Sequence, residues 1–195
     1  MSGRKHARVG LAAVSALLAL AVAVPALAAT APAPKRVTET TVGGEKFVPN
    51  RLVADTMHFK LGTIRIKSGG TVTFVDKTKN AHTFSLVKKG QVPRTAKQVD
   101  NCFGPGPCDE IAVAHGAVNP DTGEEQDPTT PLVNAGKAGF NQPGDSIILA
   151  PAGGGAAAKA HASKTNVKIT APAGKTLYFI CAIHPWMQGK VQVAR

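Results

Sequence analysis

Acidic and aromatic side chains are scarce in this 195-residue chain. Twelve Asp and Glu residues stand against 23 Lys and Arg residues, a formal net charge of +11, and there is one Trp and one Tyr. A basic chain favours an acidic partner or an anionic surface, such as that of a membrane. The lysines are scattered, however, and no basic–aromatic repeat is present, so we expect no nucleic-acid binding.

Sustained helical periodicity is also absent, and the pattern allows one short helix at most, over residues 109–115. Short alternating runs bounded by Gly, Pro or Asn recur instead, which is typical of strands. Together they predict an all-β sandwich. The expected strands are Lys46–Val53, Thr63–Lys67, Thr71–Asp76, His82–Val87, Ser146–Leu149, Val167–Thr170, Thr176–Ile180 and Lys190–Ala194.

Residues 1–28 have the features of a secretory signal peptide. Three basic residues precede an uncharged apolar run over residues 9–24, and a small-x-small cleavage pattern ends at Ala28. The alternative is a retained membrane anchor, but the run is short for a span and Pro25 interrupts it. We therefore expect cleavage, a net charge lowered from +11 to +8 by the loss of three basic residues, and no transmembrane span afterwards. The protein is expected to be periplasmic, on the cell surface or extracellular.

The stretch from residue 181 to 187 combines three side chains suited to a soft metal ion. Cys181, His184 and Met187 bring a thiolate, an imidazole and a thioether into one short loop between two expected strands. Two imidazoles, one thiolate and a weak axial thioether make a blue-copper site. The loop therefore supplies all these ligands except the second imidazole.

His82 is the candidate for that second imidazole. It shares parity with Phe84 and Leu86, so the three lie on one face of the expected strand, and the two apolar residues make it the buried face. Cys181 shares parity with Phe179 in the same way. Both donors are therefore expected to point toward the core.

These residues resemble the ligand pattern of the cupredoxins, the plastocyanin- and azurin-like blue copper proteins. The Cys-x-x-His-x-x-Met spacing, with Pro185 after the histidine, is most similar to that of amicyanin. Residues 70–76, followed closely by His82, are similar to the family's upstream strand pair. The resemblance covers Lys46–Val87 and Asn166–Arg195.

The resemblance implies a Greek-key sandwich that holds one type 1 copper ion. It implies that His184 presents its ring edge inside an apolar patch. The family often has Asn after the first histidine, and here Thr83 stands there with a hydroxyl that can make one such bond; we expect Thr83 and Asn80 to support the ligands. The implied copper ligands are His82, Cys181, His184 and Met187, and the expected patch consists of Ala182, Ile183, Pro185 and Trp186.

Three cysteines leave one unpaired in an exported protein. A disulfide between Cys102 and Cys108 would leave Cys181 as the metal thiolate, and export favours the oxidised pair. The alternative is a separate metal site formed by Cys102, Cys108 and His115, for which nothing nearby offers a fourth ligand.

One domain of useful core size is expected after the signal peptide. Residues 29–44 are expected to form a flexible tether, and residues 45–195 the cupredoxin domain. An irregular insertion is expected at about residues 88–162, and residues 100–127 within it hold seven acidic and no basic side chains. Two roles are open for the insertion. It is a docking or lid element near the copper end, or it is a solvent-exposed surface loop.

A site whose positions are all filled by protein side chains predicts outer-sphere electron transfer and not catalysis. We expect a monomeric carrier of single electrons between redox proteins such as a cytochrome, a dehydrogenase or an oxidase, and no enzyme activity. Copper oxidases and nitrite reductases need further copper sites, typically with His-x-His pairs, and the chain has none. Copper handling or storage remains an alternative, as does a metal-free adhesion sandwich; zinc suits the thioether poorly.

Overall fold

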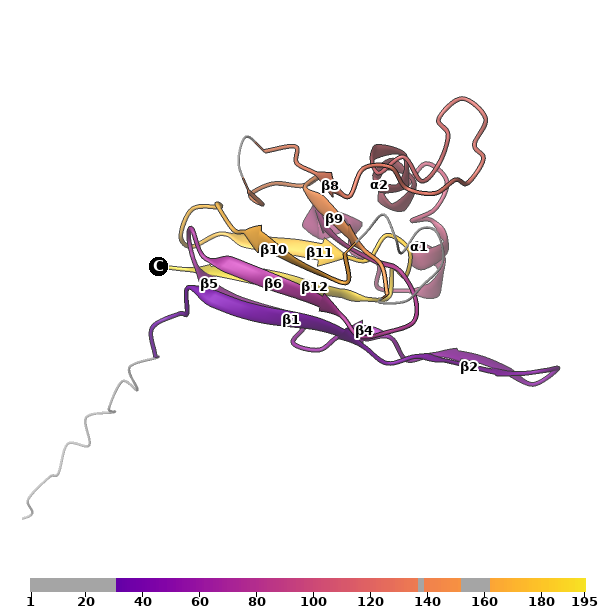
Figure 1. Cartoon of the computed structure of the whole chain (residues 1–195), viewed down its shortest axis with the longest axis horizontal. Coiled ribbons are helices and arrows are strands. Elements are labelled where there is room, and N and C mark those ends of the chain that lie inside the picture. Colours follow the sequence, from indigo (N-terminus) through magenta and orange to yellow (C-terminus); the bar gives the residue numbers. More distant parts are fainter. Residues whose placement is uncertain (1–30, 137–138, 152–161) are drawn as a thin grey trace, which may run out of the picture. The chain divides into compact units, whose positions relative to one another are not determined.

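Two β-sheets carry the fold in the computed structural model, which describes residues 31–136, 139–151 and 162–195 (Figure 1). One sheet has the strand order β10-β6-β1-β4, and the other has the order β5-β12-β11-β7-β9-β8. The signal peptide expected over residues 1–28 lies outside the described residues. The strands are β1 (Arg36–Val42), β2 (Glu45–Val48), β3 (Leu52–Asp55), β4 (His58–Phe59), β5 (Thr63–Lys67), β6 (Thr71–Asp76), β7 (His82–Val87), β8 (Leu132–Val133), β9 (Ser146–Leu149), β10 (Lys164–Lys168), β11 (Thr176–Ile180) and β12 (Gln188–Ala194).

The pairing within the two sheets is mixed. β1 runs parallel to β6, and β12 runs parallel to β5, whereas the other neighbours in these sheets are antiparallel. Most neighbouring strands are distant in the chain, so crossovers and not hairpins connect most of the strands in these sheets. The all-β sandwich with an insertion that the sequence predicts is confirmed.

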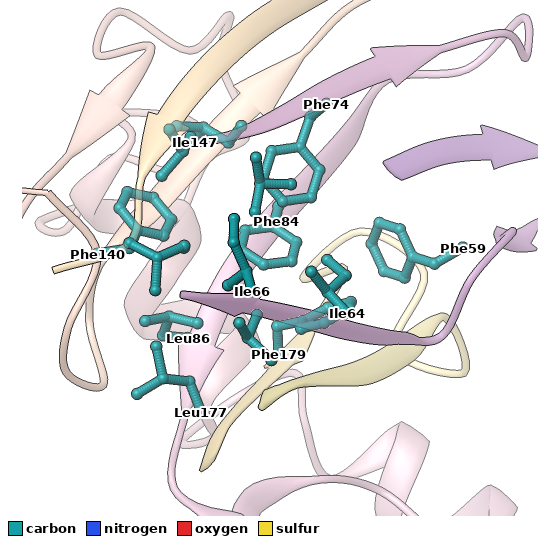
Figure 2. Close-up of a cluster of buried hydrophobic side chains, with 14 of the residues drawn as sticks. Phe59, Ile64, Ile66, Phe74, Phe84, Leu86, Phe140, Ile147, Leu177 and Phe179 are labelled. Atoms are coloured by element: carbon teal, nitrogen blue, oxygen red, sulfur yellow. The ribbon is translucent and has the colours of Figure 1, made fainter. Parts of the chain in front are cut away.

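The main core lies where the alternating strands predict it (Figure 2). β5 buries Ile64 and Ile66 and exposes the residues beside them. Five phenylalanines pack ring against ring, with the Phe84 centroid 4.2 Å from that of Phe179 and 3.9 Å from that of Phe74. Each such ring buries a large apolar area, so this cluster accounts for much of the stability of the sandwich.

β7 is buried on both of its faces, although its alternation predicted one buried face. The second face lies against a smaller apolar cluster to which the insertion contributes. This cluster contains Val87, Val92, Cys102, Cys108, Ile111, Ile180 and Ala182. The insertion therefore packs on the sandwich instead of forming a solvated excursion.

Two short helices and a disulfide organise the insertion. α1 spans Ala96–Asp100, where the Thr95 hydroxyl accepts the N–H of Gln98 as an N-cap. α2 spans Pro107–Ala114, close to the helix expected over residues 109–115, with a proline in its first turn. The expected disulfide joins Cys102 to Cys108. It excludes the alternative metal site that would have used both sulfurs.

Two parts of the expected organisation are wrong. The tether expected over residues 29–44 contains β1, which pairs with β6 along six residues. The single strand expected over residues 46–53 is a hairpin, β2–β3, that turns at Asn50, a residue with φ of 57°. The short strands β4 and β8 were not expected.

Candidate metal centre

Three donor atoms from two distant parts of the chain converge at the end of the sandwich. The Sγ atom of Cys181 lies 3.8 Å from Nδ1 of His82 and 3.8 Å from Nδ1 of His184. The two Nδ1 atoms lie 3.2 Å apart. All three residues are buried. This is a group of one thiol and two imidazole nitrogens that a single metal ion can bind together.

The strands explain how these donors meet. His82 is the first residue of β7, and Cys181 follows the last residue of β11, the strand that pairs with β7. The loop from Cys181 to Met187 is closed by two backbone hydrogen bonds, from the amide of Cys181 to the Met187 carbonyl at 2.9 Å and from the amide of Met187 to the His184 carbonyl at 2.8 Å. Met187 is 1% exposed and belongs to the same apolar cluster as Cys181.

Thr83 connects the two ligand segments. Its amide donates to the Cys181 sulfur at 3.3 Å, and its Oγ1 accepts the amide of Ala182 at 2.7 Å. Ser85 donates a further hydrogen bond to the same oxygen at 2.8 Å. The hydroxyl thus makes the bond expected in place of an asparagine side chain.

A chain of hydrogen bonds fixes the His82 ring. Its Nε2 lies 2.7 Å from Oγ1 of Thr78, which lies 2.9 Å from Oδ1 of Asp76. A carboxylate only accepts, so the Thr78 hydroxyl donates to Asp76 and accepts the Nε2–H of His82. This tautomer leaves the Nδ1 lone pair free for a metal.

Neither Asp76 nor Thr78 was singled out from the sequence. The alternation of side chains along the strand could have indicated Asp76, because this residue lies on the same buried face of β6 as Val72 and Phe74. Asn80 supports this arrangement through its backbone, with its amide 3.2 Å from the Thr78 Oγ1.

Burial sets the protonation of the metal-free site. It lowers the pKa of His82 to about 4 despite the nearby Asp76 carboxylate, which raises it. Burial also lowers the pKa of His184, and it raises the pKa of the Cys181 thiol. Both imidazoles are therefore neutral near neutral pH, whereas metal binding has to displace the thiol proton.

The exposed apolar surface beside His184 is smaller than the sequence predicts. Ile183 is 40% and Trp186 is 42% exposed, but Ala182 and Pro185 are buried. The Trp186 ring lies edge-on to the His184 ring, with centroids 5.3 Å apart. The expected apolar patch therefore reduces to two exposed side chains.

A cavity of about 690 Å³ is lined by both the insertion and this loop. Apolar side chains such as Phe103, Ile111 and Ile148 line it, together with Ala182 and Ile183 of the loop. The insertion thus reaches the neighbourhood of the metal ligands.

His115 has a structural role. It is 1% exposed, its Nδ1 lies 2.5 Å from the Thr130 carbonyl oxygen, and its Nε2 lies 2.7 Å from the Ser146 hydroxyl. Both ring nitrogens therefore have hydrogen-bond partners within the protein.

Neither a family model nor a curated protein sequence matches the chain. Its structure is similar to solved cupredoxin structures. One is a dithionite-reduced auracyanin from Roseiflexus castenholzii, with 20% identity, a TM-score of 0.40, and coverage of 84% of this chain and 100% of that one. A purple cupredoxin from Nitrosopumilus maritimus has 12% identity, a TM-score of 0.34, and coverage of 81% and 99%.

A multicopper oxidase is also similar, with 17% identity, a TM-score of 0.32, and coverage of 82% of this chain and 38% of that one. Because these TM-scores lie below 0.5, the function of this chain has to be inferred from its own donor atoms. The cluster of His82, Cys181 and His184, together with Met187, fits a single type 1 copper ion. Among the described residues, no helix is both long and apolar enough to cross a membrane.

Proposed function

We propose that the protein is an exported type 1 copper protein that carries single electrons between redox proteins by outer-sphere transfer. The observation that carries the proposal is the convergence of the Cys181 sulfur with the Nδ1 atoms of His82 and His184 inside a buried site. Copper bound there would supply a one-electron Cu(I)/Cu(II) couple. Thiolate, imidazole and a weak thioether form the ligand set of such an electron-transfer site.

The protein residues hold the donors in place before the metal arrives. The Thr78 hydroxyl orients the His82 ring, and the Thr83 hydroxyl ties β7 to the Cys181 loop. Met187 is the proposed axial donor. Ligands fixed in this way favour a small change of geometry between the two oxidation states, which is what a fast electron carrier needs.

His184 is the proposed point of electron entry and exit. It keeps 8% exposure, while Cys181 and His82 have none. The exposed side chains of Ile183 and Trp186 flank it in the same loop. Small, partly apolar surfaces of this kind suit weak and transient redox encounters.

We infer that the protein is not an enzyme, because the four proposed ligands leave no open position for a substrate. A single buried group of two imidazoles and one thiol is found among the described residues, and the whole sequence has no His-x-His pair. Turnover of oxygen or nitrite by the copper-loaded protein would overturn this inference.

The test is the visible and EPR spectrum of the protein with its signal peptide removed and with one equivalent of Cu(II). We expect an intense blue thiolate charge-transfer band and narrow copper hyperfine splitting, both lost in Cys181→Ala and His82→Gln. His58→Gln, a change in an exposed histidine, is the matched control and keeps both features. A pale spectrum that is the same in Cys181→Ala would contradict the proposal.

Electron self-exchange separates a carrier from a copper-handling protein. NMR linewidths in mixtures of the Cu(I) and Cu(II) forms measure this rate. Fast exchange with slow copper loss to a chelator supports electron transfer. Slow exchange with rapid copper loss would favour copper handling or storage instead. Fractionation of cells that produce the full-length chain tests export.

A further inference from the structure

The β2–β3 hairpin stands outside the two main sheets, and β2 lies beyond the end of the sandwich in Figure 1. In its register Phe47 faces Val53 and Glu45 faces Asp55. These four residues alternate along the two strands, so they share one face of the hairpin. Phe47 is 71% and Val53 is 75% exposed, so this face presents an apolar pair to solvent.

The base of the hairpin is closed by hydrogen bonds, and its two ends continue into β1 and β4, which pair with each other in a main sheet. The amide of Thr56 donates to the Gly44 carbonyl at 3.0 Å, and the Thr56 hydroxyl donates to the same oxygen at 2.9 Å. Gly43 has φ of 104°, and a Cβ there would collide with the Thr56 carbonyl oxygen. The backbone around Glu45 and Asp55 is therefore fixed relative to the domain.

The acidic pair lies beside the most exposed of the proposed ligands. One carboxylate oxygen each of Glu45 and Asp55 and a ring nitrogen of His184 all lie within 4.8 Å of one another. The Asn80 side chain donates to Glu45 at 2.9 Å, and the Met57 amide donates to Asp55 at 2.6 Å. No Lys or Arg of the described residues forms an ion pair with either carboxylate.

Two like charges directly opposite each other across a strand pair destabilise the hairpin. The two carboxylates face each other although the chain has almost twice as many basic as acidic residues. A cation placed between the two carboxylates from outside would relieve this repulsion. The apolar pair next along the same face would then contact the surface around that cation.

We propose that the face formed by Glu45, Phe47, Val53 and Asp55 is the docking surface for a redox protein that presents a Lys or Arg within an apolar rim. This inference rests on the proposed electron-transfer function. The basic side chain would pair with the two carboxylates, and the rim would cover the apolar pair. Because the carboxylates adjoin His184, this docking brings the partner's redox centre toward the edge of that ring.

The experiment measures oxidation of the Cu(I)-loaded protein by two small probes as a function of ionic strength. Tris(phenanthroline)cobalt(III) is cationic with an apolar surface, and ferricyanide is anionic. In Glu45→Gln/Asp55→Asn we expect the rate with the cobalt complex to fall about tenfold at low salt, the rate with ferricyanide to rise, and both differences to shrink above about 0.1 M ionic strength.

A matched control removes two exposed charges elsewhere, in Asp121→Asn/Glu124→Gln. It changes the net charge equally and leaves the cobalt rate within about twofold of the parent. Phe47→Ser is expected to slow the cobalt complex more than ferricyanide at all ionic strengths. Equal rates for the acidic double variant and its control at low salt would overturn the proposal.

Two other occupants give distinct outcomes. Tight binding of Zn²⁺ to the copper-loaded protein, lost in Glu45→Gln/Asp55→Asn, would show a cation site and overturn the docking role. Dimerisation lost in Phe47→Ser would show that a second copy of the chain covers this face, which would also overturn the docking role.

Absence of a blue spectrum in the unaltered protein would instead refute the copper function. Titration of the metal-free, ¹⁵N-labelled protein with a basic c-type cytochrome then still tests the surface, by amide shifts at residues 45–55.

Discussion

The amide of Ala182 donates a hydrogen bond of 2.7 Å to the hydroxyl of Thr83, and this bond joins the loop of one proposed ligand to the strand of another. Each residue comes directly after a ligand in the chain, Thr83 after His82 and Ala182 after Cys181. This buried hydroxyl, together with the pairing of β7 and β11, therefore fixes the distance between the imidazole and the thiolate.

Removal of that hydroxyl should loosen the site without changing its ligands. Thr83→Val keeps the shape but leaves the buried Ala182 amide unpaired, so we expect a loss of about 1–3 kcal/mol in the free energy of unfolding of the metal-free protein. We also expect a weaker blue band and faster copper loss. Thr83→Ser keeps the hydroxyl and is the control; urea unfolding and chelator competition measure both effects. Equal stability of the Val and Ser variants would contradict this role.

The chain from His82 through Thr78 to Asp76 should set both copper affinity and reduction potential. Thr78→Val removes the group that fixes the His82 tautomer, and we expect copper affinity to fall about 10- to 100-fold. Asp76→Asn removes a buried negative charge that favours Cu(II), so the reduction potential should rise. Cyclic voltammetry and copper competition are the measurements, with Thr78→Ser as control. A potential unchanged in Asp76→Asn would show that the carboxylate has no electrostatic influence on the metal.

Acid should destabilise the metal-free protein in a defined range. The pKa of His82 is lowered from 6.5 to about 4 by burial, so the unfolded chain takes up a proton at higher pH than the folded one. The contribution of neutral His82 is complete above 6.5 and is lost as pH falls toward about 4. Thermal unfolding across this range should show a steeper decline for the parent than for His82→Gln. Parallel pH profiles of the two proteins would refute the shift.

Glu39 should lower the stability of the folded protein as pH rises, the opposite of the effect expected for His82. Its side chain is fully buried in β1; Oε1 accepts the amides of Thr40 and Leu61, while Oε2 has no partner. Burial raises its pKa, so its stabilising contribution is present at low pH and is lost as pH rises through the folded pKa. The stability of Glu39→Gln relative to the parent should therefore increase with pH. Urea unfolding measures this difference, with Glu125→Gln as the exposed control, and a pH-independent difference would contradict the prediction.

The regular strands and the ligand set could be predicted from alternation and spacing. β5, β6, β7, β9 and β11 begin and end where the pattern predicts, because apolar residues mark one face of each. β1 was missed because its buried face carries Glu39 and Thr41 instead of large apolar residues. Parallel pairing with β6 buries these polar side chains, and hydropathy does not report such pairing.

The surroundings of the site were less predictable for the same reason. Asp76, Thr78 and Ser85 are polar residues whose partners come from contacts in three dimensions. The hairpin was missed because a turn at Asn50 divides what resembles one continuous strand. The packing of the insertion was also not predictable: residues 100–127 contribute Cys102, Cys108 and Ile111 to the apolar cluster beside β7.

Cys181 lies at the boundary between two separately packed interiors. Its side chain belongs to the main core, whereas its neighbours Ile180 and Ala182 belong to the cluster of the insertion, with the two disulfide-bonded cysteines. Residue 181 is thereby held on one face of the sheet by its own side chain and on the other face by the side chains of its two neighbours. We therefore expect the thiolate to stay in place whether the metal is oxidised or reduced, so that an electron passes in either direction with little rearrangement of its surroundings.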